Sequence, residues 1–160
     1  MMENYLLKSN LIFLLFFLIF ACSKKVVYPT YFEGKNTIEH LPILNDTTLA
    51  INTIAPDHNY GRIESKPIFL GVKDIYESGD NRVKFLNALA GPNGESLIFK
   101  RYKSCCPFRT QNSRTVGADQ KFGLLDIWII NYEGISKTDT LYVNAYDQGE
   151  LIAPKGYIIK

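Results

Sequence analysis

Apolar residues from Thr48 onward recur with the spacings of β-strands. Thr48 to Ile54 and Thr140 to Tyr146 alternate between apolar and polar positions, as strands with one buried face do. Pro67 to Val72 and Ser96 to Lys103 are shorter strand candidates. Gly123 to Tyr132 is apolar on both faces, which predicts a central strand covered on each side. Trp128 lies within this run, so we expect its side chain to be buried.

One segment has the spacing of a helix instead. Asp80 can cap it, and Gly91-Pro92 would end it. Its apolar face would consist of Val83, Phe85, Leu86 and Leu89. Near the other end of the domain, a five-residue connection at 134–138 predicts an antiparallel hairpin between the last two strands. The pattern therefore predicts an α+β fold, a mainly antiparallel twisted sheet with one principal helix.

The strongest apolar run, Leu11 to Ala21, lies before this domain. Eleven helical residues cover about 16 Å, only half of a hydrocarbon core of about 30 Å. The run is typical of a signal peptide, with Lys8 supplying positive charge before it. Cys22 follows directly, and the residues 19–22 resemble the processing site of bacterial lipoproteins. An ordinary secretory signal followed by an incidental cysteine is the alternative.

This interpretation divides the chain into a lipoprotein signal peptide (1–21), a lipidated N-terminus and tether (22–47) and a single α+β globular domain (48–160). Thioether-linked diacylglycerol and an N-acyl chain on Cys22 would anchor the domain stably, because two or more chains are needed for that. The membrane is then a partner through the N-terminal lipid alone. Ser23, in place of an acidic residue, favours the outer membrane, in its periplasmic or surface leaflet.

Charge narrows the choice of partners. The formal net charge is +2, with 18 basic and 16 acidic side chains, which argues against nucleic-acid binding. A local bias exists between Ile98 and Ala118, where no acid occurs. Lys103, Arg109 and Arg114, together with Lys100 and Arg101, could bind phosphate or carboxylate groups of an envelope glycolipid or polysaccharide. A solvated strand face is the alternative.

Cys105-Cys106 is the one local motif that could carry chemistry. Adjacent α-carbons lie about 3.8 Å apart, below the usual range of about 4.4 to 6.8 Å for a disulfide, so a bridge here would be strained and easily reduced. The pair could be a redox switch, a soft-metal pair or a rigid sulfur platform for a ligand. It could equally be two structural cysteines. A zinc site is disfavoured, because His40 and His58 have no recognisable spacing from the pair, and no cofactor is predicted.

Catalytic patterns are scarce in this sequence. It has no nucleophile elbow, phosphate-binding glycine loop, dinucleotide fingerprint or zinc-protease helix. Asp57-His58 has no marked nucleophile beside it. Asp126 and Asp147 could approach each other, but cap, turn or salt-bridge roles explain both. A non-enzymatic protein is favoured, with no catalytic or metal-binding residue assigned.

Several short motifs follow one another over roughly residues 67–160. They are the segment 85–95, which includes Asn93-Gly94, then Cys105-Cys106-Pro107-Phe108, Gly123-Leu124-Leu125-Asp126, Tyr132-Glu133-Gly134, Leu141 to Asn144, Tyr146-Asp147 and Ala153-Pro154. This set resembles a group of small uncharacterised lipoproteins of Gram-negative bacteria, some of which carry the name 2-dehydro-3-deoxyphosphooctonate aldolase. The resemblance implies an envelope lipoprotein and adds no active residues. Such an aldolase needs a barrel of about 250 residues with alternating strands and helices, which this chain lacks.

The sequence thus predicts a lipid-anchored cell-envelope protein with a binding or structural role. Its partner would be an envelope protein or an anionic glycoconjugate. A thiol-redox or ligand-binding protein that uses Cys105-Cys106 is the alternative, and an aldolase is a distant one.

Overall fold

The computed structural model describes residues 34–74, 76–113 and 121–160. The predicted signal peptide, Cys22 and Arg114 lie outside the described residues. Within the described part, one helix and eight short or long strands form a mixed α+β fold in which most strand pairs are antiparallel. The predicted fold class is confirmed.

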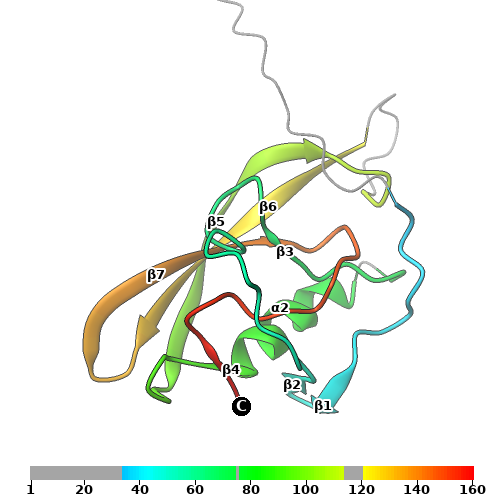
Figure 1. Ribbon diagram of the computed structural model, residues 1–160. Helices are drawn as coiled ribbons and strands as arrows, with labels where there is room; N and C mark the ends of the chain where they lie inside the picture. Colours follow the sequence, from blue (N-terminus) through cyan, green and yellow to red (C-terminus); the bar gives the residue numbers. More distant parts are fainter. Residues whose placement is uncertain (1–33, 75, 114–120) are drawn as a thin grey trace, which may run out of the picture.

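The principal sheet has four strands in the order β3-β7-β6-β5 (Figure 1). Its strands are β3 (Ile68–Phe69), β5 (Leu97–Arg109), β6 (Phe122–Tyr132) and β7 (Ile135–Asn144). The three long strands are antiparallel neighbours, whereas β3 runs parallel to β7. β6 lies between β5 and β7, as its two apolar faces predicted.

The other four strands form two small sheets. β1 (Ile43–Asn45) pairs with β2 (Thr48–Leu49), and β4 (Leu89–Ala90) pairs with β8 (Ile158–Ile159). The predicted strand at 48–54 is therefore shorter than its alternation suggested. The chain leaves it after two residues, and only an isolated bridge from Ile54 to Ala153 follows.

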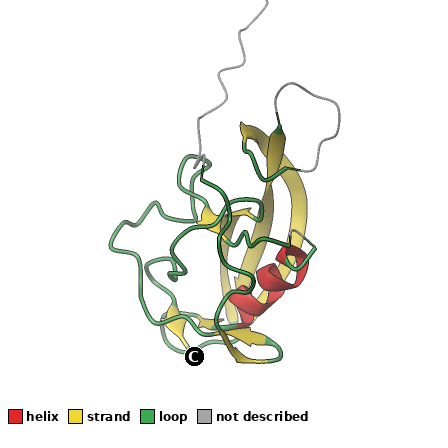
Figure 2. Ribbon diagram, turned by 90° about the vertical axis from the view of Figure 1, so that its right-hand side faces the viewer, coloured by secondary structure: helices red, strands yellow, loops and turns green. Residues whose placement is uncertain are grey.

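The single described helix, α2 (Ser78–Asn87), packs beside the long strands (Figure 2). Its N-cap is Glu77, so the prediction that Asp80 caps it is wrong. Asp80 lies in the first turn, where a negative charge suits the positive end of the helix dipole. Phe85 and Leu86 are fully buried as predicted, but Val83 is 42% exposed.

Leu89 is buried as predicted, although it lies beyond the end of α2. The helix stops earlier than Gly91-Pro92 because the next residues enter β4 and pair with β8. Long-range strand pairing, rather than the Gly-Pro signal, ends this helix.

The predicted hairpin between β6 and β7 is present, but its connection is shorter than five residues. β6 ends at Tyr132 and β7 begins at Ile135, so only Glu133 and Gly134 join them. Gly134 has φ 74°, a left-handed conformation that costs glycine little. A tight turn at Gly134 lets both strands extend further than their alternation indicated.

The hydrophobic core lies between α2 and one face of the principal sheet. Trp128, Ile130 and Leu141 of the sheet pack in one cluster with Phe85 and Leu86 of α2. A second, smaller cluster lies on the opposite face and centres on Phe108 and Leu125, both fully buried. Apolar side chains are therefore buried on both faces of the sheet.

The folded domain begins earlier than residue 48. Leu41 is buried in the main core, and Asn36 donates hydrogen bonds to the carbonyl oxygens of Val72 and Tyr146, each at 2.8 Å. The backbone N–H of Gln148 donates to the side-chain oxygen of Asn36 at 2.8 Å. These contacts attach residues 36–41, which the sequence assigned to the tether, to the domain.

Candidate functional site

Four residues of the predicted basic cluster lie along β5, the outer strand of the principal sheet: Lys100, Arg101, Lys103 and Arg109. Residues directly opposite each other in a ladder share a face, and successive residues on β6 alternate between faces. Lys103 lies opposite Ile127, an odd-numbered position of β6, whereas Arg109 lies opposite Phe122, an even-numbered one. The predicted cluster is therefore divided between the two faces of the sheet.

Three cations of β5 form no ion pair among the described residues: Lys100, Lys103 and Arg109. We call them the β5 cations. All three are exposed on the outer strand. Tyr102 lies among them, is 63% exposed, and has the Lys103 ammonium 5.5 Å from its ring centroid. Charge and an aromatic surface thus lie together along one edge.

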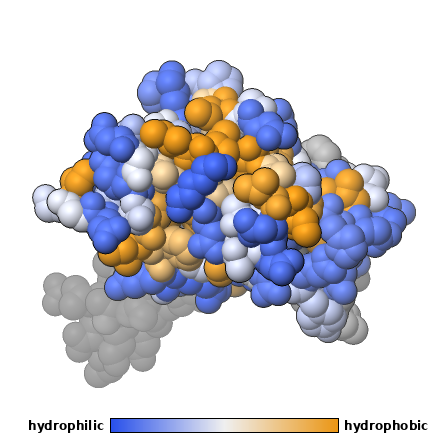
Figure 3. Space-filling model, turned by 90° about the horizontal axis from the view of Figure 1, so that it is seen from below, coloured by the Kyte–Doolittle hydropathy of each residue, from blue (hydrophilic) through white to orange (hydrophobic). Residues whose placement is uncertain are grey.

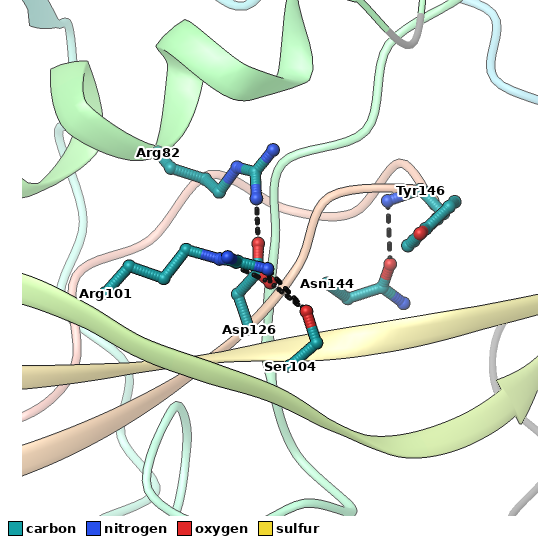
Figure 4. A network of polar contacts seen from close by, with 6 residues as sticks. All are labelled: Arg82, Arg101, Ser104, Asp126, Asn144 and Tyr146. Atoms are coloured by element: carbon teal, nitrogen blue, oxygen red, sulfur yellow. Dashed lines mark hydrogen bonds and ion pairs between the residues drawn. The ribbon is translucent and has the colours of Figure 1, made fainter.

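Arg101 behaves differently from the β5 cations, because it binds an acid within the domain. Its guanidinium donates two hydrogen bonds to Oδ1 of Asp126, from Nε at 2.9 Å and from Nη2 at 2.7 Å. Ser104 also donates to Oδ1, at 3.0 Å, and Arg82 of α2 pairs with Oδ2. Figure 4 shows Asp126 between these partners, with Arg82 reaching down from the helix.

Within the cluster of Arg82, Arg101, Ser104 and Asp126, the carboxylate is enclosed and the two arginines are more exposed. The side chain of Asp126 is 6% exposed and that of Arg101 is 48% exposed. Burial, and then the neighbouring Arg101 cation, lower the pKa of Arg82. Two cations around one carboxylate hold α2 against β5 and β6. The main role of this cluster is therefore structural.

Cys105 and Cys106 are joined by a disulfide. Their backbone forms a β-bulge, because Cys105 lies opposite Leu125 and Pro107 lies opposite the next residue, Leu124. Cys106 is the extra residue of this bulge. Its φ of 56° is the one left-handed conformation of a non-glycine residue in the described chain. Such a conformation costs about 1 to 3 kcal/mol and persists where surrounding contacts fix it.

The disulfide packs on the smaller hydrophobic cluster. Both cysteines are partly buried and contact the group formed by Phe108 and Leu125. Phe69, Tyr142 and Tyr146 pack against the same group. The pair is therefore neither a free surface loop nor part of the main core.

The buried carboxylate of Asp147 marks the end of β5. It accepts hydrogen bonds from Thr110, from Asn112 at 2.8 Å and from Asn144 at 2.8 Å. Asn112 also donates to the carbonyl oxygen of Gly34 at 3.1 Å. Gly34 therefore lies near the end of β5 that carries the disulfide. Asp126 and Asp147 have separate partners, as the sequence analysis favoured.

A shallow groove of about 520 Å³ lies elsewhere, between residues 40–43 and the first half of α2. His40 Nδ1 and Glu77 Oε2 lie 2.7 Å apart on its wall, within hydrogen-bond distance. Ile43 and Leu44 of the adjoining β1 are exposed. Figure 3 views the molecule from this end and shows small apolar patches broken by hydrophilic side chains. The mixed surface indicates no particular ligand.

Two kinds of feature are absent from the described residues. No helix there is long and apolar enough to cross a membrane. Among the same residues, no three His, Cys, Asp or Glu side chains gather where they could hold a metal ion. Asp57 pairs with Lys66 and not with a nucleophile.

No family model, curated protein or solved structure matches this chain. The resemblance to small envelope lipoproteins stays a prediction from the sequence motifs.

Sequence reasoning missed the partners of Asp126. A helical arginine and a strand arginine are far apart in the sequence, and either could have been solvated. The available signal was Asp126 itself, an acid inside an otherwise apolar central strand, since such a buried charge needs a partner.

Proposed function

We propose that this protein is a lipid-anchored component of the cell envelope, attached through Cys22, that binds an anionic glycoconjugate along the outer edge of β5. The observation that carries the proposal is the set of β5 cations, Lys100, Lys103 and Arg109. They are exposed, and no acid within the described residues neutralises them through an ion pair. Phosphate and carboxylate groups are the ligands that such cations favour.

The division of these cations between two faces favours a flexible polymer over a small compact anion. Lys103 and Arg109 lie on opposite faces of the sheet, so one phosphate cannot contact both. A chain of repeated anionic groups passing along the strand edge can reach each of them. Tyr102, exposed among them, offers a ring on which a sugar can pack.

The position of Gly34 near the end of β5 supports an envelope ligand. Gly34 lies beside Asn112, close to the end of β5. Twelve residue steps separate Gly34 from Cys22 and span at most about 40 Å. A lipid on Cys22 would therefore keep the disulfide end of β5 within about this distance of the membrane surface, where anionic glycolipids and polysaccharides are concentrated.

The anchor is tested by replacing its acceptor thiol. Cys22→Ala should yield a chain that takes up no labelled palmitate and leaves the membrane fraction, because the thioether can form only on that sulfur. The measurement is metabolic labelling followed by fractionation. Cys105→Ser with Cys106→Ser is the matched control and should keep the label. Label retained by Cys22→Ala would contradict lipidation at this residue.

Binding is tested with purified lipopolysaccharide as the probe and the mature protein in detergent. Changing Lys100, Lys103 and Arg109 together to Gln should weaken binding by about tenfold, since each exposed ion pair contributes up to about 1 kcal/mol. The salt dependence of binding should also fall. Titration calorimetry at two ionic strengths measures both quantities.

A matched triple variant separates a local effect from net charge. Lys137, Lys155 and Lys160 are exposed and lie outside β5, so their replacement by Gln removes the same charge elsewhere. We expect this control to bind nearly as well as the unchanged protein. An equal loss in both variants would show that only overall charge matters and would reject β5 as the binding edge.

A further inference from the structure

The disulfide lies where its opening can be local. Cys105 and Cys106 are in the outer strand of the sheet, at a bulge, and both are partly exposed. Regions of a protein with few buried contacts open more readily than the core. Among the described residues, the cluster beneath the disulfide has two fully buried members, Phe108 and Leu125, and is separate from the main core.

The covalent geometry favours reduction. A bridge between adjacent residues closes a small ring that includes the peptide bond, so it lacks the α-carbon spacing of ordinary disulfides, and strained, accessible disulfides are the labile ones. Cys106 also holds a left-handed backbone that a residue other than glycine adopts at a cost. Opening the ring removes the covalent constraint that helps to keep Cys106 there.

A cation lies on the same side as the first sulfur. Lys103 and Cys105 are two residues apart and face Ile127 and Leu125, which share one face of β6. A nearby ammonium lowers the pKa of a thiol and favours the thiolate. Lys103 therefore favours departure of the Cys105 sulfur when the bridge is attacked.

We propose that Cys105-Cys106 is a site of reversible thiol–disulfide exchange with a dithiol protein of the envelope, and that reduction releases the end of β5 from its bulge. One thiolate of the dithiol attacks a sulfur of the pair, the bond between the two cysteines breaks, and a mixed disulfide forms. The second thiol of the partner loses its proton, attacks the partner's own sulfur in the mixed disulfide and releases the bound cysteine of this protein, which takes up a proton. The partner ends as a disulfide, and Cys105 and Cys106 end as two thiols, having gained two electrons and two protons.

This exchange does not depend on the ligand proposed for β5. Its structural consequence is confined to one end of the sheet. Residues 104–109 should loosen, and so should 122–125, which lie opposite 105–109. The segment 128–132, which packs in the main core, should stay as it is.

The test is a stepwise reduction of the mature protein with dithiothreitol. Exposed thiols are trapped with N-ethylmaleimide and located by peptide mass, so that only Cys105 and Cys106 are counted. We expect both to be trapped at reductant concentrations that leave the fluorescence of Trp128 unchanged. Hydrogen exchange should rise in 104–109 and 122–125 but not in 128–132. If the two thiols are trapped only at reductant concentrations that also change the fluorescence of Trp128, the proposal is overturned. The disulfide would then stabilise the whole fold.

Two variants make the test independent of the reductant. Cys105→Ser with Cys106→Ser should show the raised exchange in 104–109 without dithiothreitol. Exchange equal to that of the oxidised protein would reject the release of β5. Lys103→Gln should slow reduction a few-fold, while Arg109→Gln, on the other face, should leave the rate unchanged. Equal rates for all three proteins would reject the role of Lys103.

Discussion

Trp128→Ala should lower the free energy of unfolding by about 3 to 5 kcal/mol, the usual cost of truncating a large buried aromatic side chain. Trp128 is 7% exposed on the central strand β6, which confirms the expectation that it is buried. Its ring contacts Phe99 edge to face, with centroids 5.9 Å apart. Removing the indole would leave a cavity between α2 and the sheet. Chemical denaturation followed by circular dichroism measures the loss, since the variant has no tryptophan.

Two further substitutions serve as controls for the loss of stability in Trp128→Ala. Tyr102→Ala removes an exposed aromatic residue from the neighbouring strand and should change stability by no more than about 0.5 kcal/mol. Trp128→Phe should cost less than Trp128→Ala, because the indole N–H is buried and has no hydrogen-bond acceptor among the described residues. A cost below about 1 kcal/mol for Trp128→Ala would contradict the packing of β6 against α2.

Asp126→Asn should have the next largest effect, a loss of about 2 to 4 kcal/mol. Removing one member of a buried ion pair typically costs about 3 to 5 kcal/mol, because the remaining charge stays buried without compensation. The value here is lower because Arg101 is half exposed and can regain water, whereas Arg82 is more enclosed. The same denaturation experiment measures the change, and the contact between α2 and β5 should loosen first.

Asp57→Asn is the matched control for this charge change. Asp57 pairs with Lys66, and both side chains are substantially exposed. Exposed pairs contribute about 0 to 1 kcal/mol, so this variant should stay close to the unchanged protein. Comparable losses at Asp57 and Asp126 would show that burial of the Asp126 cluster is not what stabilises it.

The local sequence pattern was sufficient to predict a helix or strand where a single segment contained the residues that determine it. The run 123–132 is apolar on both faces, and only a strand between two others can bury both. The helix around Phe85 and Leu86 was located from its spacing, and the final hairpin from two strands close in sequence. In each case the residues that decide the element lie close together in the sequence.

The boundaries of the helix, the strands and the domain were less predictable, because residues distant in the sequence determine them. Helix α2 ends where β4 meets β8, about seventy positions later in the chain. β3 pairs in parallel with β7, and no sequence pattern near residue 68 predicts this pairing. The residues 36–41 looked like a tether because their contacts, Val72 and residues 146–148, are remote in the sequence.

The candidate site shows the same division. The sequence by itself determined that two adjacent cysteines lie among cations with no acid nearby, because that is a fact of composition. Only the tertiary structure decided that Lys103 and Arg109 occupy opposite faces, that Arg101 is taken up by Asp126, and that Cys106 forms a bulge. The physical reason is register: in a strand each single-residue shift exchanges the two faces, and the two bulges of β5 shift the register in a way that only its pairing with β6 reveals.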